Sequence, residues 1–339
     1  MNNFNYVKAQ DVQEAISNVS GDERASFVAG GTNIIDLWKY NLVHVSTLVD
    51  VNHLGGDHSI EETEGGGLRL SAFATNANTA YHPLIEQNYP LLSKAILAGA
   101  SAQIRNMATN AGNLLQRTRC YYFYDENTPC NKRVPGTGCS AIGGYNRIMA
   151  ILGTNDQCIA VFPSDMCVAL AALEAVVNIT GPDGNRTIAF SDFHRLPGDH
   201  PEKDNNLNHG EIITSIDLPP KGFARNYSYL KLRDRSSYAF ALVSVATALE
   251  MDGDIIKDAR IALGGVAHKP WRITDAEEYL TNKPATREHF SVAADIILNG
   301  AQAYAFNGFK IELSRRAIIR NGLMALSPES QMPGAQPSA

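Results

Sequence analysis

The chain has 339 residues, of which 44% are hydrophobic and 19% charged, and its formal net charge is −6. This composition is typical of a globular protein with enough apolar residues for two or three domains. The acidic balance does not favour nucleic acid as a partner. No apolar run approaches the ~20 residues that span a bilayer, so we expect no membrane insertion. The first 16 residues have no basic n-region or apolar h-region, which predicts a cytosolic protein or one exported on a partner's signal.

The first 54 residues predict a small β-α-β unit. Short apolar stretches bounded by polar residues or glycine indicate strands, and apolar residues three or four positions apart indicate helices. In chain order, we expect a strand at 5–8, a helix from 11 or 12 to about 19, a strand at 26–29, a glycine turn at 30–33, a short helix at 34–40 and a strand at 44–52.

Residues 55–222 predict a second unit of mixed strands and helices. In chain order, we expect a strand after 65–67, helices at about 76–82 and 90–98, a loop at 101–113, a cysteine-containing segment, a helix at about 164–173, a hairpin of 174–180 and 186–190, a polar connector at 195–210 and a strand at 211–219.

Residues 223–325 predict a third unit, in which strands come first and helices follow. We expect a strand at 223–233, a hairpin within 237–266 that turns at 252–254, and helices at about 275–282, 286–299 and 310–324. The tail at 326–339 is rich in Pro, Ser and Gly, so we expect it to be disordered.

Four of the five cysteines lie within a segment rich in Gly, Pro and Asn that lacks apolar periodicity. They are Cys120, Cys130, Cys139 and Cys158. We do not expect such a segment to order itself by burying a core, whereas four thiolates around one metal centre would tie it together. We favour a [4Fe–4S] cluster, with zinc and unconnected thiols as the alternatives, because the spacing matches neither a disulfide framework nor a zinc ribbon. Cys167 lies in an apolar helical run and is expected to be a buried small hydrophobe.

The cysteine-containing segment is also locally basic. Between positions 117 and 158 five cationic side chains stand against three anionic ones, a surplus of two positive charges. An all-thiolate [4Fe–4S] cluster carries about −2, so a basic shell suits it, although a solvated basic loop would have the same composition.

Two glycine-containing segments are candidates for binding a phosphate. In FVAGGTNI (27–34), adjacent glycines can turn successive N–H groups inward beside a helix N-terminus. TNAGN (109–113) offers further donors, and a plain turn is the alternative for both. Asp165 could bind ribose hydroxyls or cap a helix, and Lys231 alone would be an ordinary solvated lysine. We find no catalytic motif among the scattered histidines.

Taken in order, these segments resemble the FAD-binding medium subunit of the xanthine dehydrogenase / molybdenum hydroxylase family. AGGTN at 29–33 resembles the first FAD loop of that family. IRNMATNAGN at 104–113 resembles the second, with Ala111 where a first glycine is common. EIITSIDLP, the strand with Lys231, and LGGVAHKPWR at 263–272 follow in the same order. The resemblance covers about residues 1–325.

The cysteine segment itself resembles the insert in the flavin subunit of periplasmic aldehyde oxidoreductases. In that insert LLQRTRC, PCNKR and GC recur and bind a [4Fe–4S] cluster. The flavin subunit of 4-hydroxybenzoyl-CoA reductase also carries a cluster insert and is the nearest alternative. The resemblance implies a periplasmic location by co-export with a signal-bearing partner, and a cytoplasmic location is the alternative.

Two sets of ligands follow from this resemblance, and no catalytic residue is expected on this chain. The residues implied to bind FAD, without a covalent bond, are Ser26, Phe27, Val28, Ala29, Gly30, Gly31, Thr32, Asn33, Ile34, Ala108, Thr109, Gly112, Asn113, Asp165, Ile213 and Lys231. The residues implied to bind the [4Fe–4S] cluster are Cys120, Cys130, Cys139 and Cys158.

The implied fold is α+β. It combines a p-cresol methylhydroxylase/vanillyl-alcohol-oxidase-type FAD-binding fold, made of two α/β subdomains, with a C-terminal domain like that of the CO dehydrogenase flavoprotein. The implied domains are 1–54, 55–222 with an iron–sulfur insert at 116–160, and 223–325, followed by the tail at 326–339.

The implied function is electron transfer within a molybdenum-dependent aldehyde oxidoreductase. The chain would form a heterotrimer with a large molybdenum-cofactor subunit and a small [2Fe–2S] subunit, and would pass electrons from the small subunit's clusters to an external acceptor. The alternatives are a subunit of a 4-hydroxybenzoyl-CoA reductase-like or xanthine dehydrogenase-like enzyme, a stand-alone flavin oxidase, and a zinc-stabilised scaffold.

Overall fold

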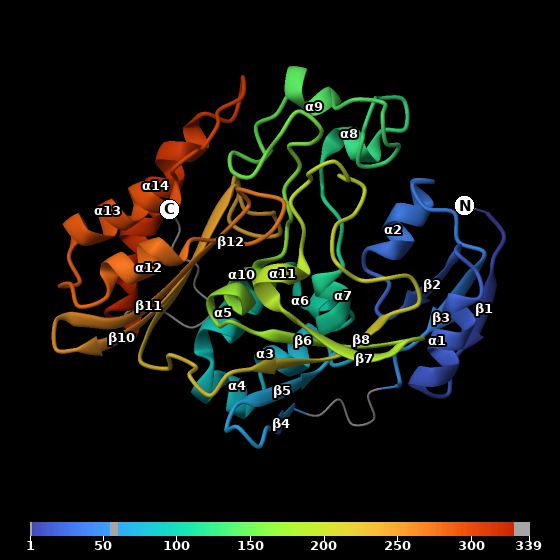
Figure 1. Cartoon of the computed structure of the whole chain (residues 1–339), viewed down its shortest axis with the longest axis horizontal. Helices are drawn as coiled ribbons and strands as arrows, with labels where there is room; N and C mark the ends of the chain where they lie inside the picture. Colours follow the sequence, from blue (N-terminus) through green and yellow to red (C-terminus); the bar gives the residue numbers. More distant parts are fainter. Residues whose placement is uncertain (1, 55–59, 329–339) are drawn as a thin grey trace.

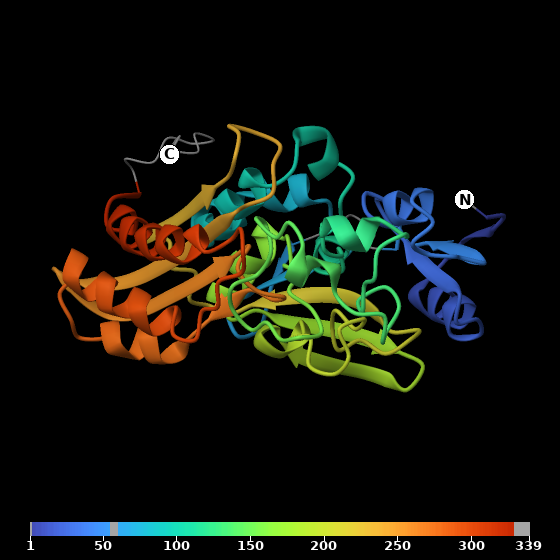
Figure 2. The ribbon, with the colours of Figure 1, turned by 90° about the horizontal axis from the view of Figure 1, so that it is seen from above.

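The computed structural model describes residues 2–54 and 60–328, which form three units with one sheet each (Figure 1). In both views the N-terminal and C-terminal units lie at opposite ends and the middle unit lies between them (Figure 2). Over the described part of the chain, no helix is long and apolar enough to cross a membrane.

The N-terminal unit is a parallel sheet with the strand order β1-β3-β2. Its elements are β1 (Asn5–Lys8), α1 (Val12–Ser20), β2 (Ala25–Val28), α2 (Ile34–Lys39) and β3 (Thr47–Asp50). The Asp11 side chain accepts a hydrogen bond from the Glu14 N–H and thereby caps α1. The buried face of α1, which includes Ile16 and Val19, belongs to the main hydrophobic core. The predicted β-α-β unit is confirmed.

The middle unit is an antiparallel sheet of five strands in the order β4-β5-β8-β6-β7, accompanied by short helices. Its elements are β4 (Ile60–Glu62), β5 (Leu68–Ser71), α3 (Asn76–Ala80), α4 (Pro83–Asn88), α5 (Pro90–Ala98), α6 (Ala102–Arg105), α7 (Asn110–Leu114), α8 (Tyr121–Tyr124), α9 (Ser140–Gly143), α10 (Asp165–Ala172), β6 (Val176–Gly181), β7 (Gly184–Ala189), α11 (Phe190–Phe193) and β8 (Ile212–Leu218). Helices α5 and α10 pack against each other, and every residue of α10 is buried. The unit is therefore organised around α10, whose first turn faces the candidate site.

The stretch at 101–113, which we expected to begin as a loop, contains the short helices α6 and α7. The side chain of Ser101 caps α6 by accepting a hydrogen bond from Ile104 N–H, and Thr109 caps α7 in the same way through Gly112 N–H. Each helix has only one or two turns, too short to produce a periodic apolar pattern.

The C-terminal unit is an antiparallel sheet in the order β12-β11-β10-β9, covered by helices. Its elements are β9 (Asn226–Leu232), β10 (Val243–Asp252), β11 (Ile255–Gly264), β12 (Trp271–Arg272), α12 (Thr274–Leu280), α13 (Arg287–Ile297) and α14 (Phe309–Ala325). The buried amide of Asn321 ties α14 to the sheet by donating to the Ser228 and Val245 carbonyls. Within the predicted disordered tail, residues 329–339 lie outside the described residues.

We expect Gly322→Ala to destabilise the C-terminal unit. A Cβ at Gly322 would lie 2.6 Å from Cδ1 of Phe290, a fully buried ring. Overpacking of this kind costs about 1–3 kcal/mol, which exceeds the ~1 kcal/mol that alanine gains over glycine inside a helix. The urea-unfolding midpoint should fall accordingly. Gly308→Ala, at the start of the same helix, is the control because its Cβ would make only an ordinary 3.5 Å contact. Equal midpoints for the two variants would contradict the packing argument.

Candidate functional site

Two glycine-containing loops, one from the N-terminal unit and one from the middle unit, touch each other at the candidate site. A Cβ on Gly30 would lie only 1.8 Å from the carbonyl oxygen of Met107, so only glycine permits this approach. Asn33, which follows Gly30 by three positions, joins the same two units. Its Oδ1 accepts a hydrogen bond from the Arg117 N–H at 2.8 Å.

A cleft of about 660 Å³ opens beside these loops. This volume lies within the ~300–1,000 Å³ typical of cofactor and ligand pockets. The predicted FAD-binding residues that line the cleft are Thr32, Asn33, Ala108, Gly112, Asn113, Asp165 and Lys231. The structure thus brings together residues that are up to 199 positions apart in the sequence.

A buried polar network holds the second loop in place. Asn110 donates to the Ser71 carbonyl at 2.9 Å and to Thr79 Oγ1 at 2.8 Å. Asn113 donates to Asn76 Oδ1 at 2.7 Å and accepts from Ser164 Oγ at 2.6 Å. The network connects α7 with α3 and with the N-terminus of α10. These three elements thus hold one another in place at the cleft wall. Asn76 itself lines the cleft and was missed in the sequence, because its partners are more than 30 positions away.

Donors without partners point to an anionic ligand in this cleft. Asn33 Nδ2, Arg105 Nε and Arg119 Nε are buried and have no hydrogen-bond partner among the residues that the structure describes, and all three residues line the cleft. Buried donors are rarely left unpaired in native proteins. The residues present therefore fit FAD, whose pyrophosphate accepts such hydrogen bonds.

A buried charge pair forms another part of the cleft wall. Lys231 Nζ lies 2.7 Å from Asp165 Oδ2, and the two side chains are 1% and 8% exposed. The Tyr229 hydroxyl donates to Asp165 Oδ1 at 2.7 Å, and Lys231 also donates to the Ala98 carbonyl at 3.1 Å. Burial and the neighbouring carboxylate raise the pKa of Tyr229 well above its usual value, so it stays a hydrogen-bond donor.

Within the protein, both carboxylate oxygens of Asp165 are thus already hydrogen-bonded. Its predicted contact with FAD hydroxyls stays a prediction, and its observed partners are Lys231 and Tyr229. Tyr229 was missed because a tyrosine in an apolar strand gives no signal of its own.

The other predicted FAD ligands lie around the cleft or away from it. Residues 26–31 form the end of β2 and the first loop, Ile34 begins α2, and Thr109 is the cap of α7. Ile213 lies in β8, is 1% exposed and is not among the residues lining the cleft. The roles of these residues toward FAD stay predictions.

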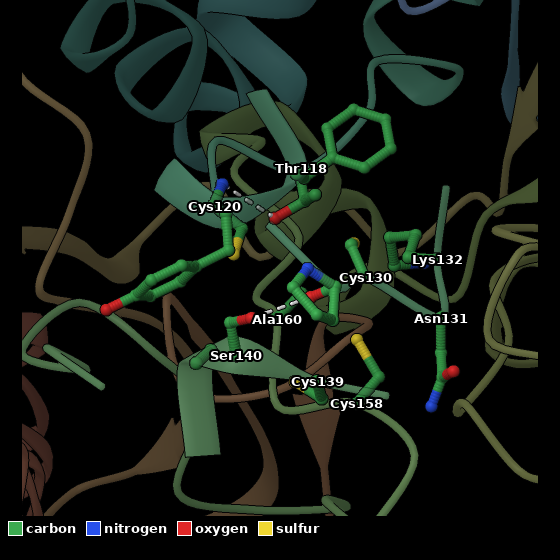
Figure 3. Close-up of a pocket in the computed structure, with 13 residues that line it drawn as sticks. Thr118, Cys120, Cys130, Asn131, Lys132, Cys139, Ser140, Cys158 and Ala160 are labelled. Atoms are coloured by element: carbon green, nitrogen blue, oxygen red, sulfur yellow. Dashed lines mark hydrogen bonds between the residues drawn. The ribbon is translucent and has the colours of Figure 1, made fainter. Parts of the chain in front are cut away.

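Four cysteines surround a second pocket, which Figure 3 shows in close-up. They are Cys120, Cys130, Cys139 and Cys158. Cys139 is half-buried and the other three are buried, and Cys130 and Cys139 face each other in an isolated β-bridge. Cys167 is a different case, a fully buried residue of α10, as predicted.

The four thiols are not equivalent electrostatically. Burial raises the pKa of Cys120 to about 12. A hydrogen bond from Cys158 lowers the pKa of Cys139 to about 6, and the same hydrogen bond, together with burial, raises the pKa of Cys158. Cys139 is thus the one thiol with a lowered pKa, and it lies among buried thiols. Binding of a metal centre would deprotonate all four thiols.

The prediction that the cysteine segment lacks a core of its own is wrong. Phe123, Met149 and Ile159 are buried together with three of the cysteines in a separate hydrophobic cluster. Arg133 donates to the Tyr122 and Phe123 carbonyls at 2.7 and 2.9 Å. These hydrogen bonds and the small core hold the segment together without the help of a metal.

Two kinds of metal centre use four cysteine ligands. Among the described residues, no group of three or more His, Cys, Asp or Glu side chains is arranged to hold a metal ion. A zinc site requires about 2.3 Å from each sulfur to one ion. In a [4Fe–4S] cluster each thiolate binds its own iron, so the sulfurs stand further apart around a larger body. Four thiols line one pocket, which is the ligand number of either centre, so the donor chemistry fits both and does not choose between them.

The cysteine pocket and the cleft share a wall. Cys120 lines the cysteine pocket, and its two neighbours in the chain, Arg119 and Tyr121, line the cleft. The linings of the two sites therefore meet at this tripeptide.

Comparisons with known proteins agree with this geometry. Residues 2–221 match the FAD binding domain in molybdopterin dehydrogenase, and residues 227–315 match the CO dehydrogenase flavoprotein C-terminal domain. The chain therefore belongs to the family of FAD-binding medium subunits of molybdenum hydroxylases. It is a subunit of an oxidoreductase, and the predicted family and fold are confirmed.

Individual relatives cover nearly the whole chain. The chain is 46% identical over 319 residues to the aldehyde oxidoreductase FAD-binding subunit PaoB of Escherichia coli K12, covering 94% of this chain and 96% of that protein. It is 26% identical to the glyceraldehyde dehydrogenase medium chain of Sulfolobus acidocaldarius, covering 83% and 82%. The crystal structure of quinoline 2-oxidoreductase from Pseudomonas putida 86 matches with a TM-score of 0.74 at 22% identity, covering 96% of this chain and 98% of that chain.

We expect Gly30→Ala to weaken FAD binding by at least about tenfold, which corresponds to 1.4 kcal/mol. The added methyl group would force the first loop away from Met107 and separate the two halves of the cleft. Equilibrium dialysis of FAD against the apoprotein measures the effect. Gly143→Ala, where the added Cβ meets no atom within 4 Å, should leave the affinity unchanged. Retention of full affinity by Gly30→Ala would show that the loop contact does not shape the cleft.

We expect Asp165→Asn to cost about 3–5 kcal/mol of folding free energy, because Lys231 would be left buried without its countercharge. Urea unfolding of the FAD-free protein separates this effect from flavin binding. Tyr229→Phe removes one hydrogen bond to the Asp165 carboxylate but leaves the ion pair in place, so it should cost less, about 1.5–3 kcal/mol. The double variant Asp165→Leu/Lys231→Met should be less destabilised than Asp165→Asn, and the opposite ranking would contradict a buried ion pair.

Proposed function

We propose that this chain is the FAD- and [4Fe–4S]-containing electron-transfer subunit of a molybdenum-dependent aldehyde oxidoreductase. The observation that carries the proposal is the pocket of four cysteines that shares a wall with the cleft. The 46% identity to an aldehyde oxidoreductase subunit supports the aldehyde branch of the family. FAD, when bound, converts one-electron arrivals into two-electron deliveries.

The chain's own residues would position FAD without reacting with it. Asn33, Arg105 and Arg119 line the cleft and each carries a buried donor that the described residues leave unpaired, while the Lys231–Asp165 pair adds no net charge to the wall. No nucleophile or proton-transfer residue is needed, because substrate oxidation would occur at the molybdenum cofactor of a partner. We propose a heterotrimer with a large molybdenum-cofactor subunit and a small [2Fe–2S] subunit.

Export is also part of the proposal. The resemblance of the cysteine segment to that of periplasmic aldehyde oxidoreductases supports a periplasmic location, reached by co-export with a signal-bearing partner. Cell fractionation of a strain expressing all three subunits tests this point, and recovery of the complex in the cytoplasm would refute it.

Metal and flavin analysis of the assembled complex tests the cofactor content. Iron, acid-labile sulfide and FAD are measured per chain after anaerobic purification. About four irons beyond those of the small subunit, with one FAD, are expected. FAD without the extra iron would refute the cluster and leave a flavin subunit of the same family. Zinc in place of iron would identify the cysteine pocket as a structural metal site.

We expect Cys130→Ser to lose the extra iron and sulfide while FAD content stays at one per chain. The segment has its own small core and hydrogen bonds, so its loss of metal should not collapse the cleft. Iron analysis and the flavin absorbance spectrum measure both contents on one sample. Cys167→Ala is the matched control, because Cys167 lies outside the pocket and its replacement should leave the iron in place. Joint loss of iron and FAD in Cys130→Ser would instead make the metal a structural clasp.

A further inference from the structure

A lysine inside the cysteine pocket is almost completely withdrawn from solvent. Lys132 follows Cys130 by two positions, and its side chain lines the pocket and is only 5% exposed (Figure 3). Lysine is almost never buried unless it is paired. Its place in the fold therefore requires an explanation beyond packing.

The ammonium group of Lys132 is held by a segment far away in the sequence. Lys132 Nζ donates to Asp204 Oδ1 at 2.5 Å and to the Pro201 carbonyl at 2.7 Å. Asp204 belongs to the polar connector at 195–210, which brings this carboxylate to the back of the cysteine pocket. Two of the three ammonium protons are thus used by these two partners.

Asp204 is shared with a second cation. Arg117 Nε donates to Asp204 Oδ2 at 2.6 Å, and the Arg117 guanidinium also donates to the Glu202 carbonyl at 3.1 Å. Burial opposes ionisation of Asp204, but the charges of Arg117 and Lys132 prevail and hold the pKa of this carboxyl below its usual value. Lys132, Asp204 and Arg117, which we call the charge triad, thus carry two positive charges and one negative charge.

The two histidines nearest the charge triad add no charge to it. His268 and His194 feel the charge of Asp204 but are buried, and burial lowers their pKa values to about 3 and about 4, so both are neutral at pH 7. The charge triad also acts on the metal ligands. Hydrogen bonding to Cys139 and burial raise the pKa of Cys158, and the Lys132 charge opposes this rise.

A partly buried surplus of positive charge matters to an anionic metal centre. An all-thiolate [4Fe–4S] cluster carries about −2, and its reduction adds one electron and therefore one further negative charge. Electrostatic interactions are stronger in a site with low water content than at the surface. A nearby cation therefore stabilises the reduced cluster more than the oxidised cluster, and a nearby anion does the opposite.

We propose that the charge triad sets the reduction potential of the cluster, with Lys132 raising it and Asp204 lowering it. The proposal rests on the proposed function, because it requires the cluster to be present. It makes Lys132 and Asp204 positioning residues for electron transfer that ligate nothing themselves. It also assigns a role to the connector at 195–210, which delivers the one negative charge of the triad.

The experiment is a potentiometric titration of the assembled complex, followed by electron paramagnetic resonance. The cluster signal is identified as the one absent from Cys130→Ser. Lys132→Met should shift the midpoint potential to a more negative value, and Asp204→Asn should shift it to a more positive value. The double variant Lys132→Met/Asp204→Asn retains one surplus positive charge, from Arg117, and should lie close to the wild type. Disruption of packing cannot produce shifts of opposite sign that cancel in this way.

The controls separate charge from other effects. Lys203→Met removes the same charge from an exposed position of the same connector, where solvent and salt screen it, and should leave the potential unchanged. Lys132→Arg keeps the charge and should restore most of the wild-type potential. If Lys132→Met binds no iron, its potential cannot be measured. A positive shift of the midpoint potential in Asp204→Asn, with no shift in Lys203→Met, would then support the proposal, and no shift in Asp204→Asn would refute it.

Two failures are distinguishable. A wild-type complex without the cluster signal would refute the proposed function and this inference together. A wild-type complex with the signal, in which Lys132→Met and Asp204→Asn leave the potential unchanged or shift it in the same direction, would refute the charge triad and leave the proposed function in place.

Discussion

The contact between Gly30 and the Met107 carbonyl is the constraint that joins the two halves of the flavin cleft and leads into the cysteine segment. The N-terminal sheet belongs to a unit of only three short strands, and it forms one wall of the cleft only where its glycine loop reaches the middle unit. The hydrogen bond from Arg117 N–H to Asn33 follows directly, and the cysteine segment begins at that point in the chain. A close backbone approach that only glycine permits thus positions the cleft and, a few residues later, the entrance to the cysteine pocket.

Each cofactor site also contains a buried charge pair, but the two pairs are balanced differently. In the cleft wall, Lys231 and Asp165 neutralise each other, and Tyr229 and a backbone carbonyl satisfy their remaining hydrogen bonds. Such a pair adds rigidity and orientation without adding net charge. At the cysteine pocket, Asp204 is outnumbered by Lys132 and Arg117. This difference in net charge matches the ligands expected at the two places. The FAD pyrophosphate would meet unpaired donors in the cleft, whereas four thiolates would concentrate negative charge inside the protein and would need cations nearby.

The regular elements and the ligand-bearing loops were predictable from the sequence, because strands such as β8 and helices such as α5 carry their own apolar pattern. The small helix α7 was not, because its stability comes from the Thr109 cap and from the contacts of Asn110 with Ser71 and Thr79. The order of the cysteine segment was not predictable either, because Arg133 orders it through backbone carbonyls. Tyr229 and Asp204 were missed for the same reason, since their partners lie more than 60 positions away.

The small core of the cysteine segment bears on what its metal centre is for. A segment that needs metal in order to fold would leave its backbone groups and apolar side chains without partners in the protein, as metal-dependent small domains do. Here Phe123, Met149 and Ile159 are buried, and the cysteines lie at the edge of an ordered structure. The flanking residues of Cys120 line the flavin cleft. The order of the cysteine segment therefore comes from its own packing and hydrogen bonds, and the segment meets the flavin cleft at Cys120.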